Sequence, residues 1–506
     1  MDHHIPVVRL VNITKSFGDV IADDGVNFEL LPGEIHGLLG ENGAGKTTLM
    51  NILYGLHQPD AGEILIRGEV HQVSSPHKAI ELGIGMVHQH FMQVATMSVI
   101  DNIILGLKVG SDFKLGRDAA RKRLLELCKL YGLNVDPDAF IWQLSIGDRQ
   151  RVEILKALYR DVNILILDEP TSVLTPQETT ELFYTIRKLV DAGLSVIFIT
   201  HKLEEATSIT NRVTVMRDGK VVATKETKKT SKPELAYLMV GREVLFRTKV
   251  ETREKNSHRD VLRVSNLKVK GDRGNIAVQG VSFTVQSGEI VGIAGVDGNG
   301  QSELTQALTG LREVLSGNFW VDDVELTNAS PYKVIQHGVG HIPEDLADGI
   351  VSDLTLVENL MLNRHYKPPY SKNGWMNERI MESEARELIH QHDIRTSGAL
   401  AKAGTLSGGN KQKLIVAREI SRNPILLIAV HPTRGVDIGA EEYIRNLLVQ
   451  MRNRRGAVLL VSTKLDEIMD LSDRILVMEK GRIMGEMMRE EANIEKIGLL
   501  MAGAEG

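Results

Sequence analysis

The sequence feature that most constrains this chain is an internal duplication. The segment GVNFELLPGEIHG at 25–37 returns as GVSFTVQSGEIVG at 280–292, and GENGAGKT at 40–47 returns as GVDGNGQS at 295–302. Both pairs are separated by 255 residues. Ordered matches at one constant spacing indicate that a single structural unit is written twice in the chain.

Further along the chain, the spacing between matching segments increases. LSIGD at 144–148 pairs with LSGGN at 406–410, which lies 262 residues later. A net insertion of 7 residues in the second copy, between about 345 and 405, explains the change. The two copies then occupy 5–241 and 259–502, in keeping with the roughly two to four domains expected of 506 residues.

Composition excludes several classes of protein. The net charge of −6 and the 4% aromatic content argue against a nucleic-acid-binding protein. The only cysteine, Cys128, excludes a disulfide framework and a cysteine-ligated zinc site. No apolar run reaches the roughly 18 residues of a membrane span, and the N-terminus has no signal pattern. We therefore expect a cytosolic chain that contacts a membrane only through a partner, with a polar linker at 242–258.

Short apolar runs alternate with helical patterns. The runs at 35–39, 164–167 and 196–200 are β-branched and carry no charge, as in strands that are buried on both faces of a parallel sheet. Helical periodicity appears at 119–131 and 177–192. Each unit is therefore predicted to have an α/β fold with crossover helices.

A phosphate-binding loop follows the first of these predicted strands. The pattern G-x-x-x-x-G-K-[ST] is matched by Gly40, Glu41, Asn42, Gly43, Ala44, Gly45, Lys46 and Thr47, and a helix begins at Thr48. Glycines allow successive backbone N–H groups to face phosphate oxygens, and the helix N-terminus adds positive potential. Lys46 supplies a full charge to the β- and γ-phosphates, and Thr47 supplies a hydroxyl to Mg²⁺.

A pair of carboxylates ends the second predicted strand. Asp168 and Glu169 follow four apolar residues at 164–167. Asp168 is placed to hold Mg²⁺ through water, and Glu169 is placed to polarise the attacking water as a general base. Taken by itself, Asp-Glu-Pro could be an ordinary capped strand end. Because it follows the phosphate loop in the expected order, we interpret it as part of a site for nucleotide hydrolysis.

These motifs, in this order, resemble the ATP-binding cassette (ABC) ATPases twice along the chain. The most specific segment is LSGGNKQ at 406–412, which is close to the ABC signature LSGGQ. The resemblance implies a P-loop NTPase with two tandem cassettes, each with a RecA-like core, an antiparallel β-subdomain and a helical subdomain. It also implies that Phe17 stacks on adenine, that Gln89 is the Q-loop residue, with a catalytic role and as a ligand of Mg²⁺, and that His201 senses the γ-phosphate.

The resemblance further implies that each ATP lies between the phosphate loop of one cassette and the signature of the other. The signature residues that would contact ATP are Ser407, Gly408, Gly409 and Asn410. In the other signature, Ile146 and Asp148 replace the family's glycine and glutamine. We expect Asp148 to repel the γ-phosphate and Ile146 to adopt a glycine-only backbone poorly.

The two copies differ at the positions that hydrolysis needs. The repeat pairs Lys46 with Gln301, Asp168 with Val430, Glu169 with His431, His201 with Thr463, Gln89 with Glu344, and Phe17 with Asp272. The intact phosphate loop therefore faces the intact signature, and the two degraded elements face each other. We predict one hydrolytic composite site and one degenerate site.

Two classes of tandem-cassette protein fit this arrangement. The first is the ATPase subunit of a membrane importer, and the second is a soluble factor that acts on the ribosome or in DNA repair. The degraded second phosphate loop and the run at 426–437 resemble bacterial simple-sugar and nucleoside importer subunits, and the run at 85–92 favours the nucleoside branch.

An importer subunit implies particular partners. They are two integral-membrane permease subunits and an extracellular substrate-binding protein, with no nucleic acid. Residues 90–105 and 345–362 would receive the coupling helices of the permeases, on the cytoplasmic face of the cell membrane.

Overall fold

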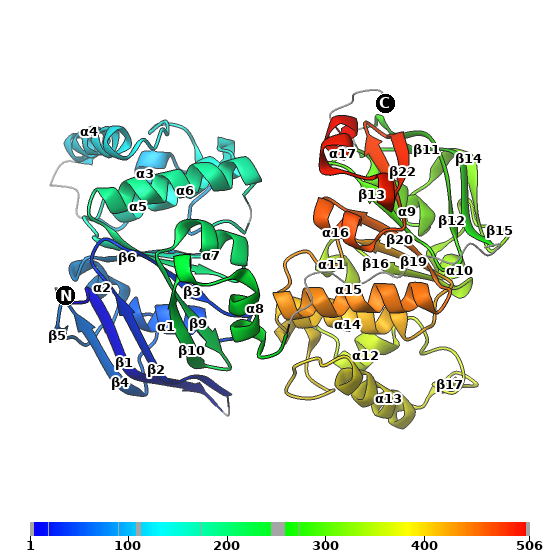
Figure 1. The fold of residues 1–506 in the computed structure, drawn as a ribbon, viewed down its shortest axis with the longest axis horizontal. Coiled ribbons are helices and arrows are strands. Elements are labelled where there is room, and N and C mark those ends of the chain that lie inside the picture. Colours follow the sequence, from blue (N-terminus) through cyan, green and yellow to red (C-terminus); the bar gives the residue numbers. More distant parts are fainter. Residues whose placement is uncertain are drawn as a thin grey trace. The chain divides into compact units, whose positions relative to one another are not determined.

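The computed structural model divides the chain into two compact units, Met1–Val244 and Leu245–Gly506 (Figure 1). It describes residues 5–18, 20–89, 91–107, 113–172, 174–243, 259–272 and 274–501. His90 and most of the predicted linker, at 244–258, lie outside the described residues. Among the residues that the structure describes, no helix combines the length and the apolar character needed to span a membrane.

A six-stranded sheet forms the centre of the first unit, in the order β10-β9-β3-β8-β7-β6. Its strands are β3 (Ile35–Leu39), β6 (Ile84–Val87), β7 (Ile164–Asp168), β8 (Ser195–Thr200), β9 (Arg212–Arg217) and β10 (Lys220–Glu226). Five strands run parallel, as predicted, whereas the edge strand β10 pairs antiparallel with β9.

Both faces of this sheet are buried, which explains the uninterrupted apolar runs. Leu165 and Leu167 of β7 pack into one hydrophobic core with the helices of the unit. Their neighbours Ile164 and Ile166 point the other way, into a second core. This alternation holds the carboxyl end of β7 between two packed layers.

The second core is closed by a four-stranded antiparallel sheet in the order β2-β1-β4-β5. Its strands are β1 (Val8–Phe17), β2 (Val20–Leu30), β4 (Ala61–Ile66) and β5 (Glu69–Val70). The helices of the unit are α1 (Lys46–Leu53), α2 (Pro76–Glu81), α3 (Val99–Ile104), α4 (Phe113–Tyr131), α5 (Ile146–Leu158), α6 (Pro176–Asp191), α7 (Leu203–Ile209) and α8 (Lys232–Val240). The predicted helices at 119–131 and 177–192 correspond to α4 and α6.

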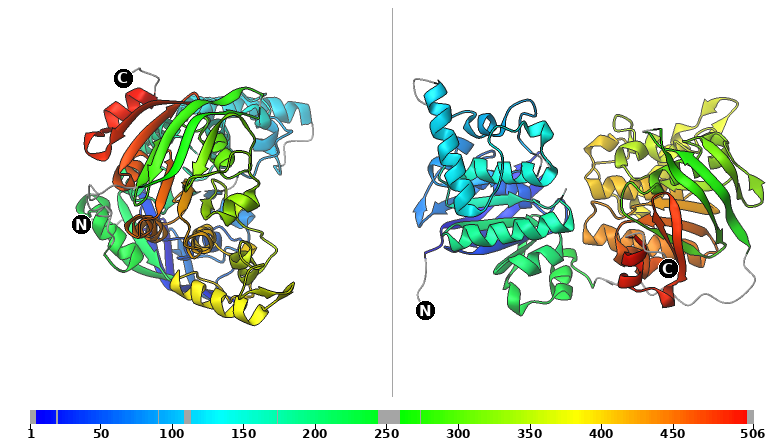
Figure 2. Two further views of the ribbon diagram at one scale, coloured as in Figure 1. Left: turned by 90° about the vertical axis from the view of Figure 1, so that its right-hand side faces the viewer. Right: turned by 90° about the horizontal axis from the view of Figure 1, so that it is seen from above.

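The second unit repeats this topology. Its main sheet has the order β16-β19-β20-β13-β21-β22, and its antiparallel sheet has the order β12-β11-β14-β15. Ile290 pairs with Val458 as Ile35 pairs with Val196, so the spacings of 255 and 262 residues reappear in the strand register. The long strands of the antiparallel sheet form one side of this unit, where β12 packs beside β22 (Figure 2).

The bounds of the second set of elements follow the same plan. The strands are β11 (Asp260–Lys270), β12 (Ile276–Gln286), β13 (Ile290–Ala294), β14 (Val314–Val321), β15 (Val324–Glu325), β16 (Val339–Ile342), β17 (Ser371–Lys372), β18 (Trp375–Met376), β19 (Leu426–Val430), β20 (Ala457–Ser462), β21 (Arg474–Glu479) and β22 (Arg482–Met488). The helices are α9 (Gln301–Leu308), α10 (Pro331–Gln336), α11 (Leu346–Gly349), α12 (Leu356–Met361), α13 (Glu378–Gln391), α14 (Gly408–Ile420), α15 (Ile438–Asn453), α16 (Leu465–Leu471) and α17 (Ile494–Met501).

The inserted residues of the second copy are divided between at least two places. The side chain of Asn102 accepts a hydrogen bond from the Val94 backbone, and Asn359 accepts the same bond from Val351. Corresponding residues of these two pairs are 257 positions apart, which is two more than the 255 of the earlier matches. Two residues are therefore inserted before Val351, near α11. The remaining residues are gained after α12, in the stretch that contains the small β17–β18 hairpin. The single insertion proposed from the sequence was therefore too simple.

Candidate active site

The phosphate loop of the first unit lies between β3 and α1, as the sequence predicted. Gly45 is the N-cap of α1, with φ of 100°. A Cβ atom there would lie 2.4 Å from Oδ1 of Asp23 and 2.5 Å from the carbonyl oxygen of Ala22, so only glycine fits. Thr47 and Thr48 lie in the first turn of the helix, whose free N–H groups can bind an anion.

Lys46 is held inside this loop. Its Nζ donates to the carbonyl oxygens of Gly40 and Glu41, at 2.8 and 2.9 Å, and its side chain is only 5% exposed. The intervening residues of the loop are Asn42, Gly43 and Ala44. The ammonium group is thus fixed beside the backbone N–H groups, where a polyphosphate would need its positive charge.

The two predicted carboxylates end β7 and differ in environment. Asp168 is 3% exposed, and its Oδ1 lies 3.5 Å from the Thr47 hydroxyl, which donates to it. Burial, and then the charge of Glu169, raise the pKa of Asp168 to about 6. Glu169 adopts a left-handed backbone with φ of 45°, a strained conformation of the kind found at functional sites.

Glu169 is held by two further predicted residues. Nε2 of Gln89 donates to Oε2 at 3.0 Å, and Nδ1 of His201 lies 2.9 Å from Oε1. Burial alone raises the pKa of Glu169, but the hydrogen bond and charge of His201, with the charge of Lys46, outweigh it, so this pKa lies below its ordinary value. Glu169 is therefore ionised at neutral pH, as a general base must be.

Phe17 is the last residue of β1. Its ring is 46% exposed and makes an edge-to-face contact with His57, at 5.3 Å between centroids. The ammonium of Lys15 lies 5.6 Å from the ring centroid. An exposed aromatic face of this kind is available to a planar ligand.

Comparison with known proteins decides the family. The ABC transporter family matches residues 24–172 and again 278–434. The chain belongs to the ABC transporter family. It is therefore an ATP-binding chain and an ABC-type ATPase with two cassettes, as its motifs predicted.

Relatives match over nearly the whole chain. A nucleoside import ATP-binding protein of Lactococcus lactis is 49% identical, and a guanosine import ATP-binding protein of Bacillus subtilis is 48% identical, each over 98% of both chains. A glucose import ATP-binding protein of Haloferax volcanii is 46% identical, over 98% of this chain and 96% of its own. Each of these relatives also spans the two cassettes.

The second cassette keeps the backbone of this site but carries different side chains on it. Gln301 replaces the lysine, and its Nε2 donates to the carbonyl oxygen of Val296 at 3.3 Å. His431 takes the place of Glu169 with nearly the same backbone, at φ of 44°. Its Nδ1 accepts a hydrogen bond from the Thr463 backbone at 3.4 Å, and burial lowers its pKa. This cassette has neither a lysine on its loop nor a carboxylate at the end of β19.

The intact signature lies at the start of α14 in the second cassette. Ser407 is its N-cap, and Gly408 and Gly409 form the first turn. The Asn410 side chain donates to the Ser407 hydroxyl at 2.9 Å and accepts from the Arg395 backbone at 2.9 Å. Asn410 thus fixes the serine hydroxyl at a helix N-terminus, where it can meet a phosphate.

The degraded signature of the first cassette differs from expectation. Ile146 was predicted to need a glycine-only backbone, and this prediction was wrong. Neither Ile146 nor its counterpart Gly408 has a positive φ, because both begin an ordinary helix. Asp148 is paired with Arg151 at 2.8 Å and accepts from the Ser145 hydroxyl at 2.8 Å, so its charge is partly balanced.

Sequence reasoning missed Asp23, which lies under the phosphate loop on β2. It is fully buried, and neither carboxylate oxygen has a hydrogen-bond partner. Burial raises the pKa of Asp23 to about 7. The repeat carried a signal that could have found it, because the matching residue of the second cassette is Val278, which is also buried.

Proposed function

We propose that this protein hydrolyses ATP at one composite site, built on the first cassette and completed by the signature of the second. The observation that carries the proposal is the state of Glu169, a carboxylate with only 13% of its side chain exposed, which Gln89 and His201 orient and whose pKa is depressed. The second cassette has His431 at that position. The cassettes would run over 5–241 and 259–502, joined by 242–258.

The first cassette offers a donor set that suits Mg²⁺. The Thr47 hydroxyl and the Asp168 carboxylate are neighbours, and the side-chain carbonyl of Gln89 is left available because its amide nitrogen donates to Glu169. These are all oxygen ligands, which Mg²⁺ prefers. When bound, the ion would neutralise charge on the β- and γ-phosphates.

The residues of the chain would then divide the remaining work. Lys46 and the N–H groups of the loop hold the phosphates, and Phe17 stacks on the adenine ring. Glu169 accepts the proton of the attacking water, and His201 keeps the carboxylate oriented toward that water. Because the site arranges groups before the reaction, its main contribution is electrostatic positioning.

The signature of the second cassette would close the same site. Ser407, Gly408, Gly409 and Asn410 would present a hydroxyl and helix N-terminal N–H groups to the γ-phosphate. The opposite pair, with Gln301 on the loop and Asp148 in the signature, would form the degenerate site. Loss of the lysine charge and of both strand-end carboxylates explains why that site would not hydrolyse ATP.

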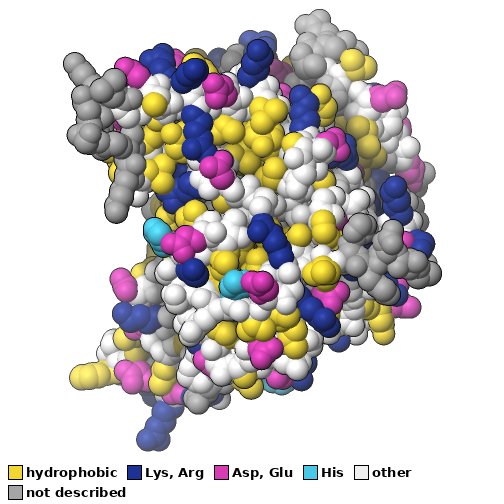
Figure 3. All heavy atoms as spheres, turned by 90° about the vertical axis from the view of Figure 1, so that its left-hand side faces the viewer, with side chains coloured by type: hydrophobic (Ala, Val, Ile, Leu, Met, Phe, Trp, Pro, Cys, Tyr) yellow, Lys and Arg dark blue, Asp and Glu magenta, His cyan; other side chains and the backbone are white. Residues whose placement is uncertain are grey.

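The hydrolytic cycle would drive import across a membrane. Its partners would be two integral-membrane permease subunits and an extracellular substrate-binding protein, at the cytoplasmic face of the cell membrane. Figure 3 shows hydrophobic side chains gathered in broad patches on one side of the first cassette. Met92, Val94 and Leu105, in the segment proposed to receive a coupling helix, all expose their side chains. Their exposure supports a partner of apolar character.

The proposed solutes are nucleosides, with simple sugars as the neighbouring class. Two of the relatives are named for import of nucleosides and one for import of glucose. None of the three is named as a ribosome or DNA-repair factor, so the soluble-factor alternative is not favoured.

Uptake measurements test this function. Cells that lack the gene should lose uptake of labelled guanosine, and the wild-type gene should restore it, whereas Glu169→Gln should not. The wild-type protein should co-purify with membrane proteins. Unchanged uptake of guanosine, ribose and glucose, together with co-sedimentation on ribosomes, would overturn the proposal in favour of the soluble factor.

A further inference from the structure

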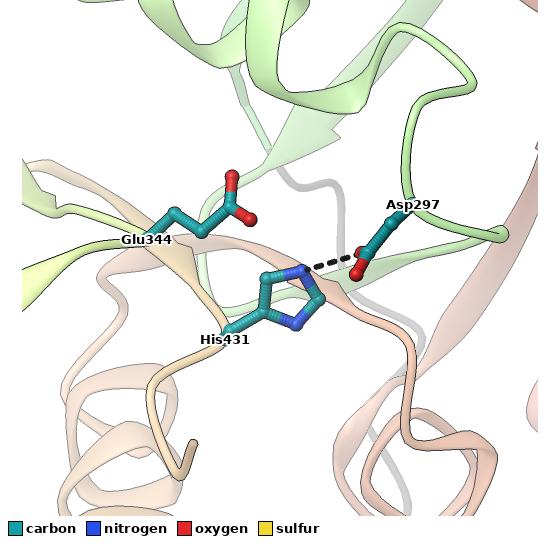
Figure 4. A group of neighbouring side chains, drawn as sticks. All are labelled: Asp297, Glu344 and His431. Carbon is teal, nitrogen blue, oxygen red and sulfur yellow. Dashed lines mark ion pairs between the residues drawn. The ribbon is translucent and has the colours of Figure 1, made fainter. Parts of the chain in front are cut away.

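Three side chains of the second cassette converge where its nucleotide chemistry has been lost. Asp297 comes from the loop before α9, Glu344 follows β16, and His431 follows β19 (Figure 4). One potential ligand atom of each residue lies within 4.8 Å of the other two. The three segments are distant in sequence, so the fold itself brings these groups together.

The repeat shows that this set is particular to the second cassette. The matching positions of the first cassette hold Asn42, Gln89 and Glu169. Two neutral amides are thus replaced by carboxylates, and the proposed general base is replaced by an imidazole. All three replacements produce metal-ligating side chains, although only one of the three original residues carries a charge.

The histidine is built into this position rather than lying on the surface. His431 is 8% exposed, and its Nδ1 accepts the Thr463 N–H at 3.4 Å. Its Nε2 faces Asp297, whose Oδ1 lies 3.6 Å away, beyond hydrogen-bond distance. This nitrogen therefore points at a carboxylate without making a short bond to it, and its lone pair becomes available to a metal once the ring proton moves to Nδ1.

The surroundings hold Glu344 and leave space beside it. The Ser302 hydroxyl donates to its Oε2 at 2.7 Å, and Arg434 donates to its Oε1 at 3.2 Å. Ser302, Glu344, His431 and Arg434 all line one cavity of about 900 Å³. Arg434 neutralises part of the charge, so the three-residue set still offers a net negative site to a cation.

We propose that Asp297, Glu344 and His431 bind a divalent transition-metal ion, with Zn²⁺ as the best-matched ion. One imidazole nitrogen and two carboxylate oxygens form a mixed set that suits Zn²⁺, whereas Mg²⁺ prefers oxygen ligands alone. Zinc ligands lie about 2.0–2.2 Å from the metal, which brings ligand atoms to roughly 3.5 Å from one another. The His431 and Asp297 atoms, 3.6 Å apart, already have about this separation, and Asp297, 58% exposed on its loop, has room to adjust its side chain.

Binding would use the Nε2 lone pair of His431. The ring proton would then lie on Nδ1, and the long hydrogen bond from Thr463 would be lost. The ion would link the loop before α9, the segment after β16 and the end of β19, three parts of the second cassette. The site lies within that cassette alone and does not rest on the assignment of hydrolysis to the first.

Zinc titration of the full-length chain tests the proposal. Metal-free protein is titrated with Zn²⁺ against a chromophoric chelator, with Mg²⁺ present in millimolar excess. Wild-type protein should bind one Zn²⁺ that Asp297→Asn and His431→Gln each weaken by at least about tenfold. Asp348→Asn is the matched control, because Asp348 lines the same cavity outside the three-residue set and should leave affinity unchanged.

Two results would overturn the proposal. Unchanged zinc affinity and stoichiometry in Asp297→Asn would mean that other histidines of the chain bind the ion. This variant is decisive because its side chain is largely exposed, so the fold should tolerate the change. Displacement of Zn²⁺ by equimolar Mg²⁺ would show instead that the site lacks the predicted preference for transition metals.

Discussion

Replacing Asp23 by asparagine removes a buried titratable carboxyl group from beneath the phosphate loop of the first cassette without changing the size of the side chain. Asp23 has no hydrogen-bond partner and no exposed surface, and burial raises its pKa from 3.8 to about 7. The folded protein therefore holds a proton on this carboxyl at pH values where the unfolded chain has released it.

The sign and size of the effect follow from linkage. Between pH 4 and pH 7 the folded state binds the additional proton, so the free energy of unfolding falls by about 1.4 kcal/mol per pH unit. Above pH 7 the loss of unfolding free energy caused by the raised pKa of Asp23 reaches about 4 kcal/mol. Between pH 5 and pH 8 the free energy of unfolding of the wild-type first cassette should fall by about 3 kcal/mol because of Asp23. The Asp23→Asn variant should not show this fall.

Calorimetric unfolding of the full-length chain at pH 5 and pH 8 measures this difference. The Asn variant should gain roughly 6–12 °C in Tm over the wild type on going from pH 5 to pH 8. Asp24→Asn is the matched control, because Asp24 is a neighbouring, partly exposed acid paired with Lys220. Equal pH dependence of the wild type and Asp23→Asn would refute the claim that Asp23 is buried as a neutral acid.

Three further substitutions and one control test the proposed active site. In steady-state ATPase assays, Lys46→Ala should lower ATP turnover by at least about a hundredfold, because it removes the buried cation beside the phosphates. The control Gln301→Ala should change turnover little. His201→Gln should slow turnover and shift the acid limb of the pH–rate profile to higher pH, because His201 holds the pKa of Glu169 down. Gly45→Ala should destabilise the first cassette by about 3 kcal/mol or more and weaken ATP binding, because the new methyl group would meet oxygens at 2.4 and 2.5 Å. Unfolding and nucleotide-titration experiments measure these two effects.

Much of the fold could be predicted because the repeat and the buried strands leave strong patterns. The strand at 35–39 was predicted with its observed bounds, and those at 164–167 and 196–200 to within one residue. The antiparallel edge strand β10 was not foreseen, since strand direction depends on the connection and not on the apolar pattern. The division of the insertion between two places was missed because the change in spacing, from 255 to 262 residues, gives only the total number of inserted residues.

The convergence of the proposed catalytic side chains in the first cassette could be predicted because each lies at or beyond the end of a strand of one parallel sheet, and such strands end at the same edge. Lys46, Asp168, Glu169, Gln89 and His201 are therefore brought together by topology. The sequence does not report backbone dihedral angles. The helical conformation of Ile146 could therefore not be predicted from the replacement of a glycine at that position. A single acid within a strand, such as Asp23, normally indicates an exposed position, and only the repeat marks it as buried.

Steady-state ATP hydrolysis by Glu169→Gln tests the central claim most directly, namely that one site on the first cassette performs all of the hydrolysis. The assay uses the full-length protein, with ATP binding measured in parallel. The predicted result is a loss of turnover of at least about a thousandfold with ATP binding retained, because only the base has been removed. Substantial turnover in this variant would show that a second site hydrolyses ATP and would contradict the account.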